Sequence, residues 1–340
     1  MNPMLRLTTA FLAAFIAAPA LANDSVAYLR TGGLEFSTTD AVVMEKEDLF
    51  LSPTLVRVNY VFRNVTDRPV DIRVAFPLPR LDMQLALSCQ DVAIPSADSE
   101  NFVDFRTTVN GRPVRMDVQT KAFAGERDIS DLLRQLNIPF ERPNGAILES
   151  LKGSSPAALR QLAEAKAISD EEHCDGSPQP IWFTETIFHW QQQFPPGVTT
   201  RISHTYRPSL GAQFITTTDR VFGSPDRLSP SDPDLSPFCV DQGTWRAIVR
   251  KGTKSDPLVM GRFLEYIVQT ARSWKGPIRD FTLTIDKMRP DAIVSLCANG
   301  IRKTGPTTFE VKRRDFVPDS DIAVLFVTAV NSAFEDAPPR

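Results

Sequence analysis

The densest group of possible metal ligands is the run Glu171-Glu172-His173-Cys174-Asp175. Carboxylate, imidazole and thiolate groups are common metal ligands in proteins, so one interpretation is a loop that binds a divalent cation through Glu171, Glu172 and His173. The spacing is not that of an EF-hand. The alternative is a solvated, charged loop that a disulfide at Cys174 holds in place. Both interpretations stay open at this point.

Two histidines, His189 and His204, lie in neighbouring stretches that we expect to form the arms of a hairpin. If Phe194 pairs with Val198 across the turn, the two rings point to opposite faces, because successive side chains of a strand alternate. A register slip of one residue would bring the rings together as a candidate metal pair. The other interpretation is a histidine that is simply packed or solvated in each strand.

Aromatic side chains gather in the same region of the sequence. Trp182, Phe188, Trp190 and Tyr206 flank or occupy the two stretches that carry the histidines. Core packing is the usual role of such residues. If Trp182, Trp190 and Tyr206 face solvent instead, their rings could stack on sugars or contact a protein partner.

No motif of covalent or cofactor-dependent catalysis occurs in the sequence. The G-x-S-x-G elbow of serine hydrolases is missing, as is an S-x-x-K motif with its partner residues. Thr31-Gly32-Gly33 is too short for a phosphate-binding loop and precedes no predicted helix. Carboxylates are numerous, but sequence spacing cannot show the separation that glycosidase chemistry needs. We therefore predict no catalytic residue and no cofactor.

The four cysteines are Cys89, Cys174, Cys239 and Cys297. An even number of cysteines in an oxidising compartment indicates two disulfides, for which three pairings exist. We favour Cys239–Cys297 and Cys89–Cys174. Because no C-x-x-C pair occurs, we do not expect a thioredoxin-like redox site or a zinc ribbon.

The first 22 residues have the features of a cleaved signal peptide: a positive Arg6, an apolar run to Pro19, and the small-x-small site Ala20-Leu21-Ala22. The apolar run is shorter than the roughly 20 residues of a membrane span, and no later window approaches that length. The sequence therefore predicts export to the periplasm, a mature chain that begins at Asn23, and no transmembrane segment in that mature chain.

The charge balance argues against one class of partner. Arg6 is the only charged residue of the predicted signal peptide, so its removal changes the formal net charge from −3 to −4. The chain has no basic block that could displace the counterions of a nucleic acid, so we expect no nucleic-acid partner.

A mainly β fold follows from the alternation of apolar and polar residues. Val56, Val58, Tyr60 and Phe62 share one face of a predicted strand, and the stretch from Val70 to Phe76 repeats the pattern after a polar turn. Pro77 and Pro79 then end the pairing, because proline cannot donate to a strand ladder. We interpret the unit as an antiparallel hairpin whose apolar face a second sheet must cover.

Further strands and helices follow from the same signals. Asn110-Gly111 predicts a hairpin turn, and Pro195-Pro196-Gly197 a third hairpin. The other strands are expected at residues 41–51, where the charged run Glu45–Asp48 interrupts the pattern, and at 102–109, 114–122, 181–194, 198–206, 281–285, 292–296, 308–312 and 322–328. Helices are expected after Asp128, Ser155 and Asp241. Residues 263–274 fit either state, and we favour a strand.

These elements suggest antiparallel β-sandwich lobes with a small helical insertion. Residues 23–125 form the N-terminal β-sandwich lobe, 126–179 a helical insertion or connector, and 180–335 the C-terminal β-sandwich lobe. The alternative is that the two lobes form one composite unit. Residues 216–237, rich in Ser, Asp and Pro, are expected to form a long loop of the kind that is usually functional or disordered.

Several blocks of the sequence resemble a bacterial domain-of-unknown-function family, the one numbered 4424. The blocks are Asn23-Asp24-Ser25 with Thr31-Gly32-Gly33-Leu34, YVFRN, AFPLP, VNGRPV, HWQQQFPPG, HTYRPSLG, FCVD, WKGPIRDFTLTIDK and VSLCANGIRKTGPTTFEVKRRDFVP. The resemblance covers nearly the whole mature chain. It implies an exported, β-rich protein and supplies no catalytic residue.

A fainter likeness is to the VIT domain of inter-α-trypsin inhibitor heavy chains. It covers Val56 to Val118, where a strand, a polar turn, a second strand ending in FPLP and a "dGrpv" hairpin come in the same order. The D-x-S-x-S metal site of that family's usual companion domain does not follow.

Two classes of function are consistent with these observations. The first is a non-enzymatic binding or scaffold protein of the bacterial cell envelope, whose partner is an envelope protein or a glycan and whose loops sit on a rigid β-scaffold. The second is a metal- or carboxylate-dependent hydrolase that acts on cell-envelope glycan. We favour the first, because no motif supports the second.

Overall fold

The structure is a computed structural model that describes residues 25–30, 33–88, 94–217, 235–252 and 258–330. Strands predominate, and most of them pair antiparallel, so the predicted mainly β fold is confirmed. The predicted signal peptide lies outside the described residues, as do residues 218–234 of the predicted long loop.

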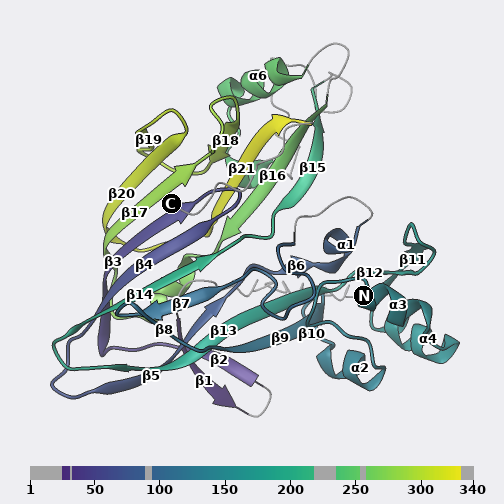
Figure 1. Cartoon of the computed structure of the whole chain (residues 1–340), viewed down its shortest axis with the longest axis horizontal. Coiled ribbons are helices and arrows are strands. Elements are labelled where there is room, and N and C mark those ends of the chain that lie inside the picture. Colours follow the sequence, from purple (N-terminus) through teal and green to yellow (C-terminus); the bar gives the residue numbers. More distant parts are fainter. Residues whose placement is uncertain (1–24, 31–32, 89–93, 218–234, 253–257, 331–340) are drawn as a thin grey trace, which may run out of the picture.

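The largest sheet, here called the central sheet, contains strands from both halves of the chain (Figure 1). Its eight described strands are, in spatial order, β19 (Arg302–Lys303), β20 (Thr308–Phe316), β17 (Ile278–Asp286), β3 (Val42–Leu51), β4 (Val56–Asn64), β14 (Thr199–Tyr206), β7 (Arg106–Val109) and β8 (Arg112–Pro113). Asn110 and Gly111 both have positive φ, as the predicted two-residue turn between β7 and β8 requires.

Two further sheets supply the rest of the β structure. Among the described residues, the seven-stranded sheet has the order β10 (Arg127–Asp128), β9 (Asp117–Ala124), β13 (Phe183–Phe194), β5 (Val70–Pro77), β1 (Ser25–Arg30) and β2 (Gly33–Ser37), with β6 (Leu81–Asp82) also on β13. The four-stranded sheet has the order β15 (Gly211–Thr216), β16 (Leu258–Tyr266), β21 (Ile322–Ala329) and β18 (Ile293–Leu296). A small pair joins β11 (Ile168–Glu172) to β12 (Pro178–Pro180).

One apolar core, the shared core, lies between the central sheet and the other two sheets. The alternation in β4 buries Val58, Tyr60 and Phe62 there, as predicted. Phe76 of the seven-stranded sheet and Tyr266 of the four-stranded sheet belong to the same core, and their rings lie 6.3 Å apart. Tyr60 and Tyr266 also share a hydrogen bond of 3.0 Å between their hydroxyls. The two smaller sheets therefore cover one face of the central sheet.

The predicted hairpins at residues 56–79 and 181–206 are wrong. β4 lies in the central sheet and β5 in the seven-stranded sheet, while β13 and β14 are divided between the same two sheets. The chain from β8 to β9 makes the same crossing. Each pair of strands is thus an arch, in which the strands face each other across the core instead of pairing. The alternation of apolar residues is the same in both cases, so the pattern could not distinguish an arch from a hairpin.

Buried Asn64 fastens two of these arches together. Its Nδ2 donates to the carbonyl oxygens of Arg68 and Phe194, each at 2.8 Å, and its Oδ1 accepts from the backbone N–H and hydroxyl of Thr66. The backbone carbonyl of Asn64 accepts from Gly197 N–H at 3.0 Å. One side chain therefore orders the turn after β4 and ties it to the end of β13.

A parallel pairing joins the two halves of the chain. β3 pairs with β17 in parallel, with Lys46 opposite Asp280 and Leu51 opposite Ile285. The charged run in β3 does not interrupt the strand; the register shifts between Met44 and Lys46, which is a β-bulge, and Glu47 is buried. Strands from residues before 125 and after 180 alternate in two sheets, which favours the composite arrangement. The boundaries of separate lobes stay a prediction.

Helices cover the outer faces of the sheets at two places. α1 (Met83–Ala86), α2 (Ser130–Gln135), α3 (Ala146–Lys152) and α4 (Pro156–Glu164) form a second apolar cluster, the helical core, with Ala122 and Trp182. α6 (Gln242–Lys251) and the 3₁₀ helix η1 (Ser236–Phe238) cover the outer face of the four-stranded sheet. The side chains of Ser155 and Asp241 cap α4 and α6, as predicted. Residues 263–274 divide: the strand ends at Tyr266, and the 3₁₀ helix η2 (Gln269–Ser273) follows.

The Cys239–Cys297 disulfide is formed, with 5.0 Å between the Cα atoms. It joins the end of η1 to the end of β18. Cys174 is also disulfide-bonded. Its expected partner, Cys89, lies outside the described residues, so that pairing stays a prediction.

Removal of the Cys239–Cys297 bond should lower the free energy of unfolding by about 4 kcal/mol, because the bond closes a loop with a sequence separation of 58. The double variant Cys239→Ser/Cys297→Ser, compared with the oxidised protein by urea titration, measures the loss. An unchanged unfolding midpoint would show that the bond adds nothing to the contacts of η1 and α6.

Asn64→Ala should lower the free energy of unfolding by about 1–3 kcal/mol, because it leaves the buried carbonyl oxygen of Phe194 without the Asn64 donor. Thermal unfolding followed by circular dichroism gives the comparison. Thr66→Ala is the matched control, because it removes one partner of Asn64 and keeps both donated bonds. Equal losses in the two variants would contradict a linking role for Asn64.

Candidate functional site

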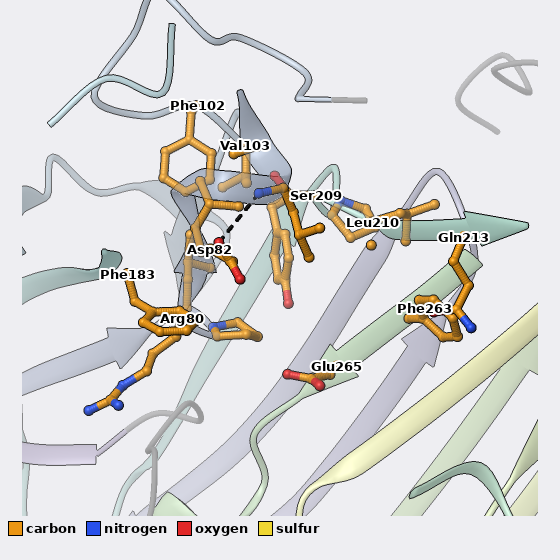
Figure 2. A pocket seen from close by; sticks show the side chains of 18 of the residues that line it. Arg80, Asp82, Phe102, Val103, Phe183, Ser209, Leu210, Gln213, Phe263 and Glu265 are labelled. Atoms are coloured by element: carbon orange, nitrogen blue, oxygen red, sulfur yellow. Dashed lines mark hydrogen bonds between the residues drawn. The ribbon is translucent and has the colours of Figure 1, made fainter. Parts of the chain in front are cut away.

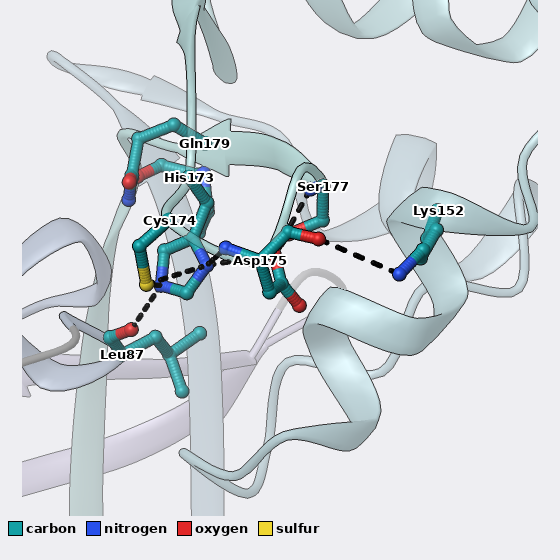
Figure 3. Close-up of polar contacts among 8 residues, drawn as sticks. Leu87, Lys152, His173, Cys174, Asp175, Ser177 and Gln179 are labelled. Carbon is teal, nitrogen blue, oxygen red and sulfur yellow. Dashed lines mark hydrogen bonds and ion pairs between the residues drawn. The ribbon is translucent and has the colours of Figure 1, made fainter.

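The structure does not bring the ligand-type residues at 171–175 together around one point. Glu171 and Glu172 are exposed at the end of β11, whereas the His173 ring is buried. The His173 Nε2 lies 2.7 Å from the carbonyl oxygen of Leu87, and Nδ1 lies 2.8 Å from Oδ1 of Asp175 (Figure 3). The imidazole therefore ties the β11–β12 turn to the end of α1, while the two glutamates face solvent.

Asp175 completes this turn as an acceptor. Its Oδ1 accepts from the Ser177 hydroxyl at 2.5 Å and from the Ser177 backbone N–H at 2.9 Å. These bonds from Ser177, together with the His173 ring, lower the pKa of Asp175 well below its usual range. The contacts describe a local structural turn. In the described part of the chain, no group of three or more His, Cys, Asp or Glu side chains is placed to hold a metal ion.

The two strand histidines lie on different sheets and do not meet. His204 points from β14 into the shared core, where its ring is fully buried and its Nδ1 lies 2.8 Å from the Thr107 hydroxyl. His189 lies on the opposite, outer face of the seven-stranded sheet, with Nδ1 3.1 Å from the Arg73 guanidinium. Desolvation and the positive charge of Arg73 lower the pKa of His189. Because β13 and β14 do not pair with each other, no register between them brings the two rings together.

Two of the three candidate binding aromatics have rings that are inaccessible to a ligand. Trp182 lies in the helical core and Trp190 in the shared core, and both are buried. Tyr206 is also buried, but it lines a cleft. Burial raises the pKa of its hydroxyl, which has no hydrogen-bond partner among the described residues.

This cleft, with a volume of about 480 Å³, is the site that we consider a candidate for function. One side consists of the chain that follows β5, with β6 and α1; the other side consists of β15 and β16, with the end of η1 (Figure 2). The segment that leaves β14, from Tyr206 to Leu210, lies between the two sides. Most of the lining is apolar, and its size and character are those of small-molecule sites in proteins. The rings and aliphatic chains include Leu78, Phe102, Phe183, Leu210, Phe238 and Phe263.

The strand pattern of β16 explains one wall. Leu264 and Tyr266 point into the shared core, so Phe263 and Glu265 lie together on the other face. The Phe263 ring stacks on Phe238 with 5.0 Å between ring centroids. The carboxylate of Glu265 has no hydrogen bond or ion pair with any described residue, and Figure 2 shows it extending into the open part of the cleft.

The electrostatics of the cleft differ on its two sides. Arg80 donates to Glu185 at 2.7 Å and pairs with Glu126 at 3.5 Å, so its charge is already compensated. Glu265 is exposed to the cleft but has protein on most sides, and this desolvation, together with the nearby Asp321 carboxylate, raises the pKa of Glu265. An unpaired carboxylate beside a stacked aromatic ring is the chemical feature of this site.

Sequence reasoning missed this cleft and Glu265. Its lining residues come from separated stretches, at 78–86, 102–103, 183, 206–213, 237–238 and 263–265, which no spacing in the sequence connects. The only local signal was the polar Glu265 in a predicted strand whose neighbours are apolar.

Glu265→Gln should stabilise the protein at neutral pH, because the raised pKa means that folding disfavours the ionised carboxyl. The advantage over wild type should decrease as the pH falls through the folded pKa and become small below about pH 4, where the carboxyl is mostly protonated in both states. Urea titrations between pH 4 and 7 test this, with exposed Glu149→Gln as the control. A less stable Gln variant at pH 7 would show that Glu265 has a favourable partner.

The comparisons with solved structures give low similarity. A candidate nutrient binding protein from Legionella pneumophila is 15% identical, with a TM-score of 0.41, over 85% of this chain and 68% of that chain. An M1 zinc metallopeptidase from Deinococcus radiodurans is 8% identical, with a TM-score of 0.26, over 85% of this chain and 43% of the peptidase. At these scores neither likeness bears on function, and no curated protein matches the sequence.

The family comparison covers almost all of the chain. The described helices include none with the length and apolar character needed to cross a membrane. The fainter likeness of residues 56–118 to the VIT domain has no support in these comparisons. The resemblance of the sequence blocks to family 4424 is confirmed, because the family model matches residues 22–325: the chain belongs to the family described as a domain of unknown function, DUF4424.

Proposed function

We propose that this protein is a non-enzymatic binding protein of the cell envelope and that its ligand occupies the cleft between β6–α1 and β15–β16. The observation that carries the proposal is the cleft itself, a concave and mainly apolar site of about 480 Å³. Polar groups on its lining have no hydrogen-bond partner among the described residues, among them the carboxylate of Glu265 and the hydroxyls of Tyr206 and Ser209. Apolar walls with a few uncompensated polar groups are typical of ligand sites.

The construction of the walls supports a preformed site. β6 is fixed on β13, β15 is fixed on β16, and the Tyr206 ring packs against Phe76 in the shared core. Each side of the cleft is therefore held by a sheet, so a ligand would not have to order the residues that contact it. The hydrolase alternative has no observation in its favour among the described residues.

Export is part of the proposal. The features of residues 1–22 are those of a signal peptide, and the family model begins its match at residue 22, one residue before the predicted mature chain. The disulfide at Cys239–Cys297 also fits an oxidising compartment.

Gln213→Trp should abolish binding of the apolar dye Nile red, because Gln213 lines the cleft beside Phe263 and an indole there would fill the space. Fluorescence enhancement of the dye by purified protein measures the binding. The matched control is Phe214→Trp, because the next side chain of β15 is exposed on the opposite face of the strand.

We expect the wild type and Phe214→Trp to enhance the dye equally and Gln213→Trp to lose the effect. Equal enhancement by both variants would show that the dye binds elsewhere. No enhancement by wild type would contradict an apolar ligand site in this cleft.

A further inference from the structure

We propose that the ligand of this cleft is an organic cation, an ammonium or guanidinium group on an apolar body, and that Glu265 is its counter-ion. This inference rests on the proposed binding function and adds the chemical class of the ligand. It is carried by three features of the cleft: the balance of charge, the placement of aromatic rings, and the solvation of Glu265.

The charge of the cleft is negative and uncompensated on one side. Among its described lining residues the charged side chains are Arg80, Asp82 and Glu265. Arg80 is held by Glu185 and Glu126, and its guanidinium also lies over the Phe123 ring at 5.5 Å. Figure 2 shows this guanidinium extending away from Glu265. A bound anion would therefore be repelled by the Glu265 carboxylate and would gain little from Arg80, whose charge is already compensated. A bound cation would instead form an ion pair with Glu265.

Asp82 adds to this preference without competing for the same place. Its Oδ1 accepts from the backbone N–H groups of Gln84 and Leu85 at the start of α1, at 2.8 Å and 3.3 Å, so it acts as a helix cap. Its negative charge is part of the cleft lining and has no cationic partner among the described residues. Asp82 thus contributes to the local potential, and Glu265 is the carboxylate free to contact a ligand.

Aromatic rings lie where the rest of a cation would sit. Phe263 and Glu265 are two residues apart on one face of β16, so their Cα atoms are about 7 Å apart along the strand. Phe263 is half-buried, with its ring stacked on Phe238, and the half-buried Phe183 lines the opposite side of the cleft. A ring face attracts a cation through its quadrupole, and a neighbouring carboxylate adds charge attraction. A carboxylate next to an accessible ring is suited to an alkylammonium or guanidinium group.

The environment of Glu265 disfavours its charged form, which is what a binding site for a cation would show before the cation binds. Desolvation and the Asp321 carboxylate both disfavour its ionised form. Asp321 faces it from the start of β21 and accepts from the backbone N–H groups of Val268 and Gln269. The other charged groups of the cleft are Arg80, which is already paired, and Asp82, which caps α1. A bound cation would offset the desolvation, so cation affinity should rise as the pH increases from 4 to 7.

The test compares two probes of the same carbon skeleton: 4-phenylbutylamine, which ends in a charged ammonium, and 4-phenylbutanol, which ends in a neutral hydroxyl. Isothermal titration calorimetry with wild-type protein, Glu265→Gln and the remote Glu149→Gln measures each affinity. We expect wild type to bind the amine more tightly than the alcohol. We expect Glu265→Gln to lose about 10- to 100-fold in amine affinity, with little change for the alcohol. Glu149→Gln should match wild type, because Glu149 is exposed on α3 and does not line the cleft.

A third probe distinguishes the source of the cation. The capped peptide acetyl-Leu-Lys-Phe-amide presents an ammonium on a protein side chain, whereas the amine presents it on a small molecule. Tighter binding of the peptide that depends on Glu265 would identify the cation as a partner protein's side chain. Tighter binding of the free amine would identify a small-molecule ligand. Both results support an organic cation.

Two results would overturn the inference, and they differ in what they mean for the proposed function. If amine and alcohol bind equally and Glu265→Gln changes neither affinity, the cleft binds apolar ligands without discriminating by charge. The inference then fails, and the binding function stands. If wild type binds none of the three probes and also fails to enhance Nile red, both the inference and the proposed function fail. Glu265 is exposed and makes no described polar contact, so Glu265→Gln should fold; its melting curve confirms that before titration.

Discussion

The architecture depends on covering one apolar face of the central sheet. That face runs from β20 to β7, and neither of the two sheets that pack on it covers it alone. The seven-stranded sheet covers one part and the four-stranded sheet the other, and their residues join in a single core at Phe76, Tyr60 and Tyr266. The two covering sheets lie side by side along the central sheet (Figure 1). The cleft is lined by residues on both of these sheets and by the segment from Tyr206 to Leu210.

The sequence was sufficient for the strands and insufficient for their pairing. Val58, Tyr60 and Phe62 alternate as a half-buried strand must, and Asn110-Gly111 forms the turn that its residue types favour. Whether β4 pairs with β5 or faces it depends on which strands arrive later to cover the edges, namely β14 and β13. Those are contacts between distant residues, and a local pattern carries no information about them. The side chain of Asn64 shows the same limit, since its bond to the Phe194 carbonyl spans the two arches.

The candidate site was less predictable than the fold. The residue types chosen from the sequence were the usual metal ligands and aromatics, and the structure uses them to build its interior: His204 and Trp190 fill the shared core, and His173 orders a turn. The cleft depends instead on ordinary residues whose environment makes them unusual. Glu265 matters because nothing pairs with it and because Phe263 lies beside it, and both facts come from packing. Among the candidate site residues chosen from the sequence, only Tyr206 also lines the cleft.

The parallel pairing of β3 with β17 has a consequence for how the chain reaches this state. β3 is among the first strands to be synthesised and β17 among the last, so one edge of β3 has no partner until nearly the entire polypeptide exists. An open edge can capture strands from other molecules. Contacts of such long sequence separation also slow folding, since the loop between them must close first. A chain truncated before β17 would therefore tend to aggregate. The nascent protein needs protection of the free edge of β3 until β17 has been synthesised.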